Sequence, residues 1–255
     1  MLKSKQEKLQ NNLNYKLRTV VGNYHRSFWC NMKYDNIVKG TFIKRPNRFI
    51  ATCEINGEEE ICHVKNTGRC RELLLNGVTV YLEKSSNPNR KTKYDLISVQ
   101  KNDRLINMDS QVVNKVVHEF IPTLFENIKH IKPEYKYGNS RIDFYVETDS
   151  DRVLVEVKGV TLENDGVVSF PDAPTERGIK HLKELQKAVT EGYKAYVLFV
   201  VQMSDVKYFK PNIITHPEFA TELKKAKENG VIPLAFDCAV SIDSIEIRKP
   251  VLIKL

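Results

Sequence analysis

The feature that most constrains the fold of this chain is a pair of short runs rich in Val, Ile, Phe and Tyr, at residues 141–147 and 152–159. Runs of this composition on either side of a polar turn predict a β-hairpin. If the four residues between them form the loop, the antiparallel register places Asp143 directly opposite Glu156. The pattern therefore predicts two like charges that face each other across a strand pair.

The predicted hairpin has two unlike faces, because side chains alternate along a strand. One face is suited to a core and carries Ile142, Phe144, Val146, Val153, Val155 and Val157. The other face holds Asp143, Glu156 and Lys158, with Tyr145 and Leu154 as partial shielding. Like charges that are directly opposed destabilise a sheet, so a cation between the carboxylates is expected.

Two carboxylates with neighbouring backbone carbonyls form a hard oxygen site of the kind that Mg²⁺ or Mn²⁺ accepts. Lys158 beside such a metal could orient a water molecule or stabilise charge on a phosphate. The alternative is a solvated hairpin with a surface Glu–Lys pair, which contributes little energy. The residue types alone leave both interpretations open.

Composition limits the class of protein. With 255 residues, 41% of them hydrophobic and 28% charged, the chain suits one large or two modest domains of a soluble protein. No apolar run approaches the length of a membrane span. The five cysteines are odd in number and form no C-x-x-C pair, which is typical of reduced thiols. We therefore expect a cytoplasmic protein with no membrane partner.

Positive charge is concentrated in the first part of the chain. Residues 1–110 hold 20 Lys and Arg residues against 11 Asp and Glu, whereas residues 111–255 hold 20 against 21. A basic front half joined to a nearly neutral second half favours a polyanionic partner, and nucleic acid fits best. A lysine-rich surface that serves solubility would not explain the asymmetry.

The first 110 residues divide into a polar segment and a β-rich one. Residues 1–36 lack a sustained period and are expected to form an N-terminal extension, and translation from Met32 is one hypothesis for the first 31 residues. Residues 37–110 predict strands at 37–44, 48–55, 60–64, 78–84, 94–100 and 105–108, and a short helix at 69–75. This succession suits a small OB-like barrel, which binds single strands along a basic groove. The candidate contacts are Arg45, Arg48, Phe49, Arg69, Arg90, Lys91 and Lys93.

From residue 111 the period changes to that of a mixed α/β domain. Apolar residues at helical spacing predict a helix from Val112 towards Pro122, and Glu119 near its end could reach the site as a further carboxylate. Thr175 is a plausible N-cap for a second helix that ends near Gly192. Residues 195–202 predict a buried strand, 216–229 a third helix, and 231–238 and 242–247 two more strands.

The second predicted helix carries a polar face. Arg177, His181 and Glu184 recur at i, i+4 and i+7 and therefore lie on one side of it. An Arg–His face of this kind suits phosphate contacts, although such triads are usually ordinary polar helix surface.

Five segments carry a resemblance to a known family. FIKRPNRFIA, NTGRCREL, YGNSRIDF, VEVKGVTL and FPDAPTERGIKHLKEL resemble the sugar fermentation stimulation protein A (SfsA) family, from about Ile37 to the C-terminus. The resemblance implies a DNA-binding protein with an N-terminal OB-like domain at 37–110 and a PD-(D/E)xK nuclease-like domain at 111–255. One departure is Lys65, where this family leads us to expect proline.

The resemblance also implies roles for the site residues. Asp143, Glu156 and Lys158 match the metal-site Asp and the E-x-K pair of such nucleases, and Glu119 matches the helical Glu of many members. Asp143, Glu156 and the Val157 carbonyl would then hold Mg²⁺ or Mn²⁺. Lys158 would position the water that hydrolyses a phosphodiester.

Around that site, Arg141, Arg177 and His181 would contact phosphates or support the ligands. The expected partner is nucleic acid, and DNA in the first place. Two alternatives stay open. One is a non-catalytic, largely non-specific DNA-binding regulator of sugar (maltose) metabolism genes. The other is an OB-type module that serves another enzyme.

Overall fold

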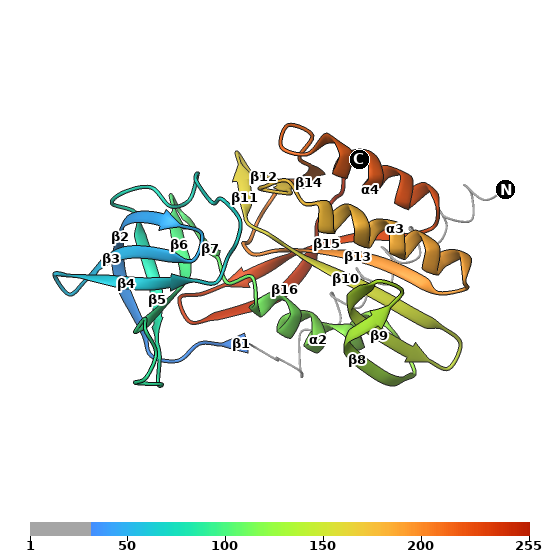
Figure 1. Ribbon diagram of the computed structural model, residues 1–255, viewed down its shortest axis with the longest axis horizontal. Coiled ribbons are helices and arrows are strands. Elements are labelled where there is room, and N and C mark those ends of the chain that lie inside the picture. Colours follow the sequence, from blue (N-terminus) through green and yellow to red (C-terminus); the bar gives the residue numbers. More distant parts are fainter. Residues whose placement is uncertain (1–31) are drawn as a thin grey trace.

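A closed five-stranded barrel forms the first part of the computed structural model, which describes residues 32–255 (Figure 1). Its strands are β2 (Ile37–Asn47), β3 (Ile50–Ile55), β4 (Glu58–Val64), β5 (Thr79–Lys84) and β6 (Tyr94–Lys101). They follow the order β4-β3-β2-β5-β6, and a parallel pairing of β4 with β6 closes the ring. β7 (Arg104–Asn107) adds to the free edge of β6. The predicted OB-like barrel is confirmed.

The prediction of a short helix at 69–75 is wrong. This segment forms turns, in which the amides of Leu73 and Leu74 both donate to the carbonyl of Cys70. Cys70 itself has a positive φ of 48°. Both amides donate to the same carbonyl, and Cys70 has left-handed backbone geometry. The segment therefore forms a single turn, and no helix continues from it.

The second part of the chain is built on a seven-stranded mixed sheet, in the order β1-β16-β15-β13-β10-β9-β8. Its strands are β1 (Met32–Lys33), β8 (Ile128–Tyr137), β9 (Ser140–Thr148), β10 (Arg152–Val160), β13 (Lys194–Val201), β15 (Ile232–Val240) and β16 (Ser244–Pro250). β10, β13 and β15 run parallel, and the outer pairs are antiparallel. The predicted mixed sheet is confirmed.

Helices cover both faces of this sheet (Figure 1). α2 (Val112–Leu124) lies on one face, and α3 (Glu176–Thr190) and α4 (Pro217–Glu228) lie on the other. The predicted N-cap is present, since Thr175 Oγ1 accepts from the amide of Gly178 at 3.0 Å. α2 continues through Pro122 to Leu124, further than proline led us to expect, and the amide of Phe125 still donates to Ile121.

Five strands have no counterpart in the predicted set. They are the short strand β1, the edge strand β8 and the strands of a small separate sheet, β11 (Leu162–Asn164), β12 (Val167–Phe170) and β14 (Tyr208–Pro211). β8 reads IKHIKPEYKY, with apolar residues three or four apart and Pro133 inside it. Such a pattern does not alternate, and proline is tolerated only at an edge, so β8 lacks the signature of a strand.

The N-terminal extension, expected at residues 1–36, includes at its end residues that are part of the fold. Met32 and Lys33 pair with β16, and Tyr34 is buried with its hydroxyl 3.4 Å from Asp109. These residues belong to the folded body of the protein. The hypothesis about translation from Met32 concerns residues 1–31, which lie outside the described part of the chain.

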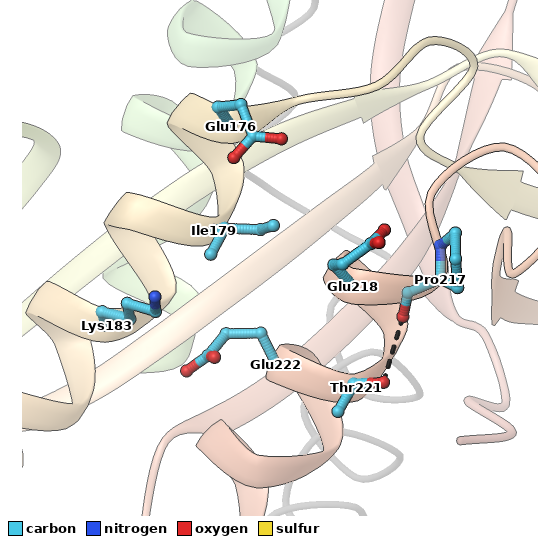
Figure 2. A pocket seen from close by; sticks show the side chains of 7 residues that line it. All are labelled: Glu176, Ile179, Lys183, Pro217, Glu218, Thr221 and Glu222. Atoms are coloured by element: carbon cyan, nitrogen blue, oxygen red, sulfur yellow. Dashed lines mark hydrogen bonds between the residues drawn. The ribbon is translucent and has the colours of Figure 1, made fainter.

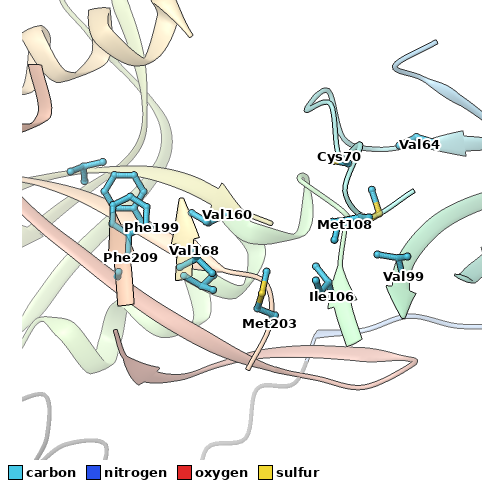
Figure 3. Close-up of a cluster of buried hydrophobic side chains, with 14 of the residues drawn as sticks. Val64, Cys70, Val99, Ile106, Met108, Val160, Val168, Phe199, Met203 and Phe209 are labelled. Carbon is cyan, nitrogen blue, oxygen red and sulfur yellow. The ribbon is translucent and has the colours of Figure 1, made fainter. Parts of the chain in front are cut away.

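The barrel and the mixed sheet share one hydrophobic cluster (Figure 3). Ile106 and Met108 approach it from the barrel, and Val160 and Met203 approach it from the sheet. The two parts are therefore held together, and the barrel has a defined place relative to the hairpin. Among residues 32–255, no helix is long and apolar enough to cross a membrane.

Candidate active site

Asp143 lies at the point where the ladder between β9 and β10 stops. The predicted register is confirmed over four residue pairs, the last of which is Val155 with Phe144. The ladder does not include the predicted pair of Asp143 with Glu156. Instead, Asp143 Oδ2 accepts a hydrogen bond from the amide of Val157 at 2.7 Å. The Asp143 carboxylate thus replaces a main-chain carbonyl as the acceptor for the Val157 amide, where the β9–β10 ladder ends.

This irregularity also moves Ile142 to the other side of the sheet. Ile142 packs in the cluster beneath α3 and α4, whereas Phe144 packs in the cluster beneath α2. The expectation that both share one face is therefore wrong. Strict alternation fails where the Asp143 side chain enters the ladder, and Glu134 on the neighbouring strand has a positive φ of 53° at the same level.

The second carboxylate oxygen of Asp143 is held from α2. Asn114 donates from Nδ2 to Asp143 Oδ1 at 2.9 Å. Sequence reasoning missed Asn114 and assigned this helix's contribution to Glu119. Five residues separate the two, about 140° around a helix, so they cannot point the same way. Glu119 is exposed, and its charge lies near Glu246 rather than at the hairpin.

Glu156 is buried and accepts two contacts on one oxygen. Its side chain is 2% exposed, and Lys158 Nζ and His181 Nδ1 both contact Oε1. The other oxygen, Oε2, is buried without a hydrogen-bond partner. A buried carboxylate oxygen without a partner costs free energy, so a cation or a hydrogen-bond donor that contacted Oε2 would stabilise the site.

His181 holds Glu156 from α3. Arg177 Nε donates to His181 Nε2 at 3.4 Å, which leaves Nδ1 to carry the proton that faces Glu156. His181 is only 4% exposed. Of the two roles expected for His181, its burial and its contact with Glu156 favour support of the ligands over direct contact with a phosphate, because α3 packs this side of the helix against the sheet. Arg177, on the same helix, is exposed.

The two carboxyl groups differ in acidity. Burial, together with the neighbouring Glu156, raises the pKa of Asp143 to about 6, although the Val157 amide, Lys158 and Asn114 oppose the change. Burial would also raise the pKa of Glu156, but Lys158 and His181 outweigh it and lower that pKa. Glu156 is therefore the fixed charge of the site, and Asp143 is the group whose charge an added cation would stabilise.

The donor set fits a hard divalent cation. Asp143, Glu156 and the main-chain carbonyl of Val157 offer oxygen atoms, which are the ligands that Mg²⁺, Mn²⁺ and Ca²⁺ prefer. Oε2 of Glu156 has no hydrogen-bond partner and is therefore available to bind such a cation. Within residues 32–255, no three His, Cys, Asp or Glu side chains are grouped to hold a metal. Water would therefore complete the coordination.

Several cations that were predicted to bind nucleic acid are engaged within the protein. The guanidinium of Arg45 donates to four backbone carbonyls, at distances of 2.6 to 2.9 Å, namely those of Arg48, Asn66, Gly68 and Arg69. Arg45 thus fixes the surrounding loops and is not free for a phosphate. The other engaged cations are Lys93 with Glu60 at 2.8 Å, Arg90 with Asp95 at 2.6 Å, and Arg141 with Glu134 at 3.4 Å.

Other predicted contacts face solvent. Arg48, Arg69 and Lys91 are exposed, and no described carboxylate pairs with them. Arg48 lies 5.3 Å from the centre of the Phe49 ring, which is 50% exposed. Lys65, the departure from the family pattern, contacts Asp95 at 2.9 Å and so has a structural partner.

Comparison with known proteins agrees with both parts of the fold. The family described as "SfsA N-terminal OB domain" matches residues 43–108, and the "Sugar fermentation stimulation protein RE domain" matches residues 107–244. A sugar fermentation stimulation protein homolog of Clostridium beijerinckii is 63% identical over 219 residues, 85% of this chain and 97% of that protein. A homolog of Desulfitobacterium hafniense is 59% identical over 225 residues, 88% and 99% of the two chains.

A solved structure is also similar. The structure of Pyrococcus furiosus SfsA in complex with Ca²⁺ superposes with a TM-score of 0.80 at 28% sequence identity. The match covers 88% of this chain and 98% of that one. The likeness therefore extends over both the barrel and the mixed sheet.

Proposed function

The chain belongs to the sugar fermentation stimulation protein family, and from its site we propose that it hydrolyses phosphodiester bonds of DNA with the help of a divalent cation. The observation that carries the proposal is the buried Glu156 carboxylate. Lys158 and His181 share one of its oxygens, and the other is unpartnered beside Asp143. A protein that only binds DNA needs no such arrangement.

Asp143, Glu156 and the Val157 carbonyl would hold Mg²⁺ or Mn²⁺. The similar Pyrococcus furiosus SfsA, whose structure contains Ca²⁺, supports a hard divalent cation in this family. When bound, the cation would act as a Lewis acid on the phosphate and lower the pKa of a coordinated water.

The protein's own residues would do the rest. Lys158 orients the attacking water and stabilises negative charge on the phosphate oxygens. His181 and Lys158 fix Glu156 so that Oε2 stays available, and Asn114 with the Val157 amide fixes Asp143. Arg177, exposed on the turn of α3 next to His181, would contact a neighbouring phosphate.

The test is cleavage of labelled single- and double-stranded DNA and RNA by purified protein, with Mg²⁺, Mn²⁺ or EDTA. We expect cleavage with the metals, none in EDTA, and loss of at least about a hundredfold in Lys158→Ala and Asp143→Asn. Lys183→Ala removes an exposed lysine of α3 and serves as the matched control. Equal cleavage by all variants would identify a contaminating nuclease.

A second candidate is a DNA-binding regulator of sugar metabolism genes that does not cut. Two observations favour it: Glu119 does not supply a third carboxylate, and the described residues contain no cluster of three acidic, His or Cys ligands. Binding of DNA with no cleavage under any metal condition would support this candidate and refute the nuclease.

A further inference from the structure

The barrel carries a hollow at the end where β2 turns into β3. Its volume is about 450 Å³, within the usual range for ligand pockets. One wall is the end of β2 with the turn that follows, and the other is the loop that joins β4 to β5. The basic residues that line it are Lys44, Arg45, Arg48, Arg69 and Arg71.

Four of these cations are free to bind a ligand. Lys44, Arg48, Arg69 and Arg71 are exposed, and none pairs with a carboxylate within residues 32–255. Elsewhere on the barrel, Lys93 and Arg90 are paired with acidic side chains, and the unpaired Lys39, Lys84 and Lys91 do not line the hollow. Unpaired cations that converge on one hollow repel each other, and a polyanion relieves that repulsion.

The fifth cation makes the hollow rigid. Arg45 binds four carbonyls of the two walls, as described above, so its guanidinium joins the β2–β3 turn to the β4–β5 loop. Asn66 adds two bonds, from Nδ2 to the carbonyl of Met108 at 3.0 Å and from the amide of Gly68 to Oδ1 at 2.8 Å. A preformed arrangement of cations binds a ligand at a smaller entropic cost.

The same loop touches the segment that leads into α3. The amide of Cys70 donates to Asp172 Oδ2 at 2.8 Å. Asp172 precedes Thr175, the N-cap of the helix that carries Arg177 and His181. The hollow is thus joined by one hydrogen bond to the element that supports Glu156.

Two other surfaces repel a polyanion. The β3–β4 hairpin, part of the usual binding face of an OB fold, exposes Glu54, Glu58 and Glu59, and Glu54 lies directly opposite Glu59. The hollow between α3 and α4, shown in Figure 2, is lined by Glu176, Glu218 and Glu222, and Lys183 is its only basic lining residue. These two surfaces are therefore less suited to a nucleic acid than the basic hollow of the barrel is.

The hollow also has an aromatic neighbour. Phe49 is half exposed and lies beside Arg48. Bases of a single strand stack on such rings, whereas a duplex hides its base faces. An Arg–Phe pair next to unpaired cations is therefore suited to an unpaired base and its phosphates.

We propose that this basic hollow binds a single-stranded segment of nucleic acid, with phosphates on Arg48, Arg69 and Arg71 and a base on Phe49. The proposal deepens the function proposed above, since the bound strand would continue towards α3 and Glu156. Binding itself requires no cleavage.

The test is fluorescence anisotropy in EDTA with a labelled DNA of about 16 nucleotides, the upper end of an OB-fold site, and with its duplex. We expect wild-type protein to bind the single strand more tightly than the duplex. Arg69→Ala/Arg71→Ala should weaken single-strand binding at least about tenfold and lower the slope of log affinity against log salt by about 1.4. Phe49→Ala should weaken it about tenfold.

The matched control is Lys39→Ala/Lys84→Ala, which removes two exposed, unpaired lysines of the barrel outside the hollow. It should change affinity by less than about twofold, and Arg71→Lys should retain most binding. Thermal unfolding checks that each variant is folded. Equal losses in the control and the hollow variants, or duplex binding as tight as single-strand binding, would overturn the proposal.

The outcome is separable from that of the nuclease. Asp143→Asn should bind the single strand like wild type, because the hollow lies outside the carboxylate site. Hollow-dependent binding without any cleavage would keep this inference and refute the nuclease. Cleavage together with binding that does not depend on the hollow would support the nuclease and refute this inference.

Discussion

At the residue scale, Asp143 and Glu156 carry the same charge in unlike surroundings. Lys158 compensates the charge of Glu156 and His181 donates a hydrogen bond to it, whereas Asp143 is held by an amide and by Asn114, neither of which carries charge. Without a cation, the ionised Asp143 is therefore an unfavourable feature of the folded state. Sites that bind charged ligands commonly trade stability for function in this way.

Asp143→Asn should stabilise the metal-free protein by about 1 kcal/mol, because it removes the repulsion from Glu156 and keeps an oxygen for the Val157 amide. Urea unfolding in EDTA at neutral pH measures the difference. Added Ca²⁺ should raise the stability of wild type and leave that of the variant almost unchanged, since ligand binding stabilises only the state that binds. A variant that is less stable in EDTA, or that gains as much from Ca²⁺, contradicts the assignment.

His181→Ala should weaken metal binding about tenfold or more, because Glu156 would lose the donor that fixes its orientation. Asparagine can present an N–H near the position of Nδ1, so His181→Asn should recover most of the affinity. Titration calorimetry with Mn²⁺ gives both values, and Lys183→Ala on the exposed side of α3 is the control. If the alanine and asparagine variants bind equally well, His181 does not position Glu156.

At the element scale, sequence patterns predicted those features of strands and helices that depend on which side chains are buried. The hairpin register follows from a loop of four residues between the two strands, and the N-cap follows from Thr175 before a helical run. The position of Asp143 in the ladder could not be predicted, because a bond from a side chain to the Val157 amide leaves no periodic trace. Contacts from other elements, such as those of Asn114 and His181, depend on how helices pack and not on their own pattern.

The barrel has its own electrostatic anchor at Asp95. Burial would raise the pKa of this carboxyl group, but Arg90 and Lys65 outweigh it and lower the pKa to about 2. Arg90 lies in the loop before β6 and binds both oxygens, at 2.9 and 2.6 Å. Asp95 therefore holds the β5–β6 loop on the barrel.

Asp95→Asn should destabilise the protein by about 2 kcal/mol at pH 7. The folded-state pKa lies below the ordinary value of 3.8, so the stabilisation is complete above that value and disappears as the pH falls through about 2. The loss on mutation should therefore be smaller at pH 3. Urea unfolding at the two pH values measures it, with the exposed Asp103→Asn as control. An equal loss at both pH values would mean that packing, not charge, is responsible.

At the scale of the whole molecule, the barrel and the mixed sheet behave as one packed body. The shared cluster in Figure 3 is reinforced by Glu163 of β11, whose carboxylate lies 2.7 Å from Lys101 and 2.8 Å from Arg104. A strand in the basic hollow and the carboxylate site would thus keep a fixed relation. Neither the pairing of Glu163 nor the shared core could be predicted from the sequence, because both join residues far apart in the chain, 62 positions in the case of Lys101 and Glu163.

Glu163→Gln should lower the free energy of unfolding by about 2 kcal/mol, because Lys101 and Arg104 would lose their buried partner. If the two parts unfold together, the loss must appear equally in both. Hydrogen exchange measured on peptides from β3 and β13 reports the barrel and the sheet separately. Glu228→Gln, at an exposed position of α4, controls for the loss of one charge. A fall confined to the barrel peptides would show that the barrel opens alone, and the hollow would then not keep a fixed place relative to Glu156.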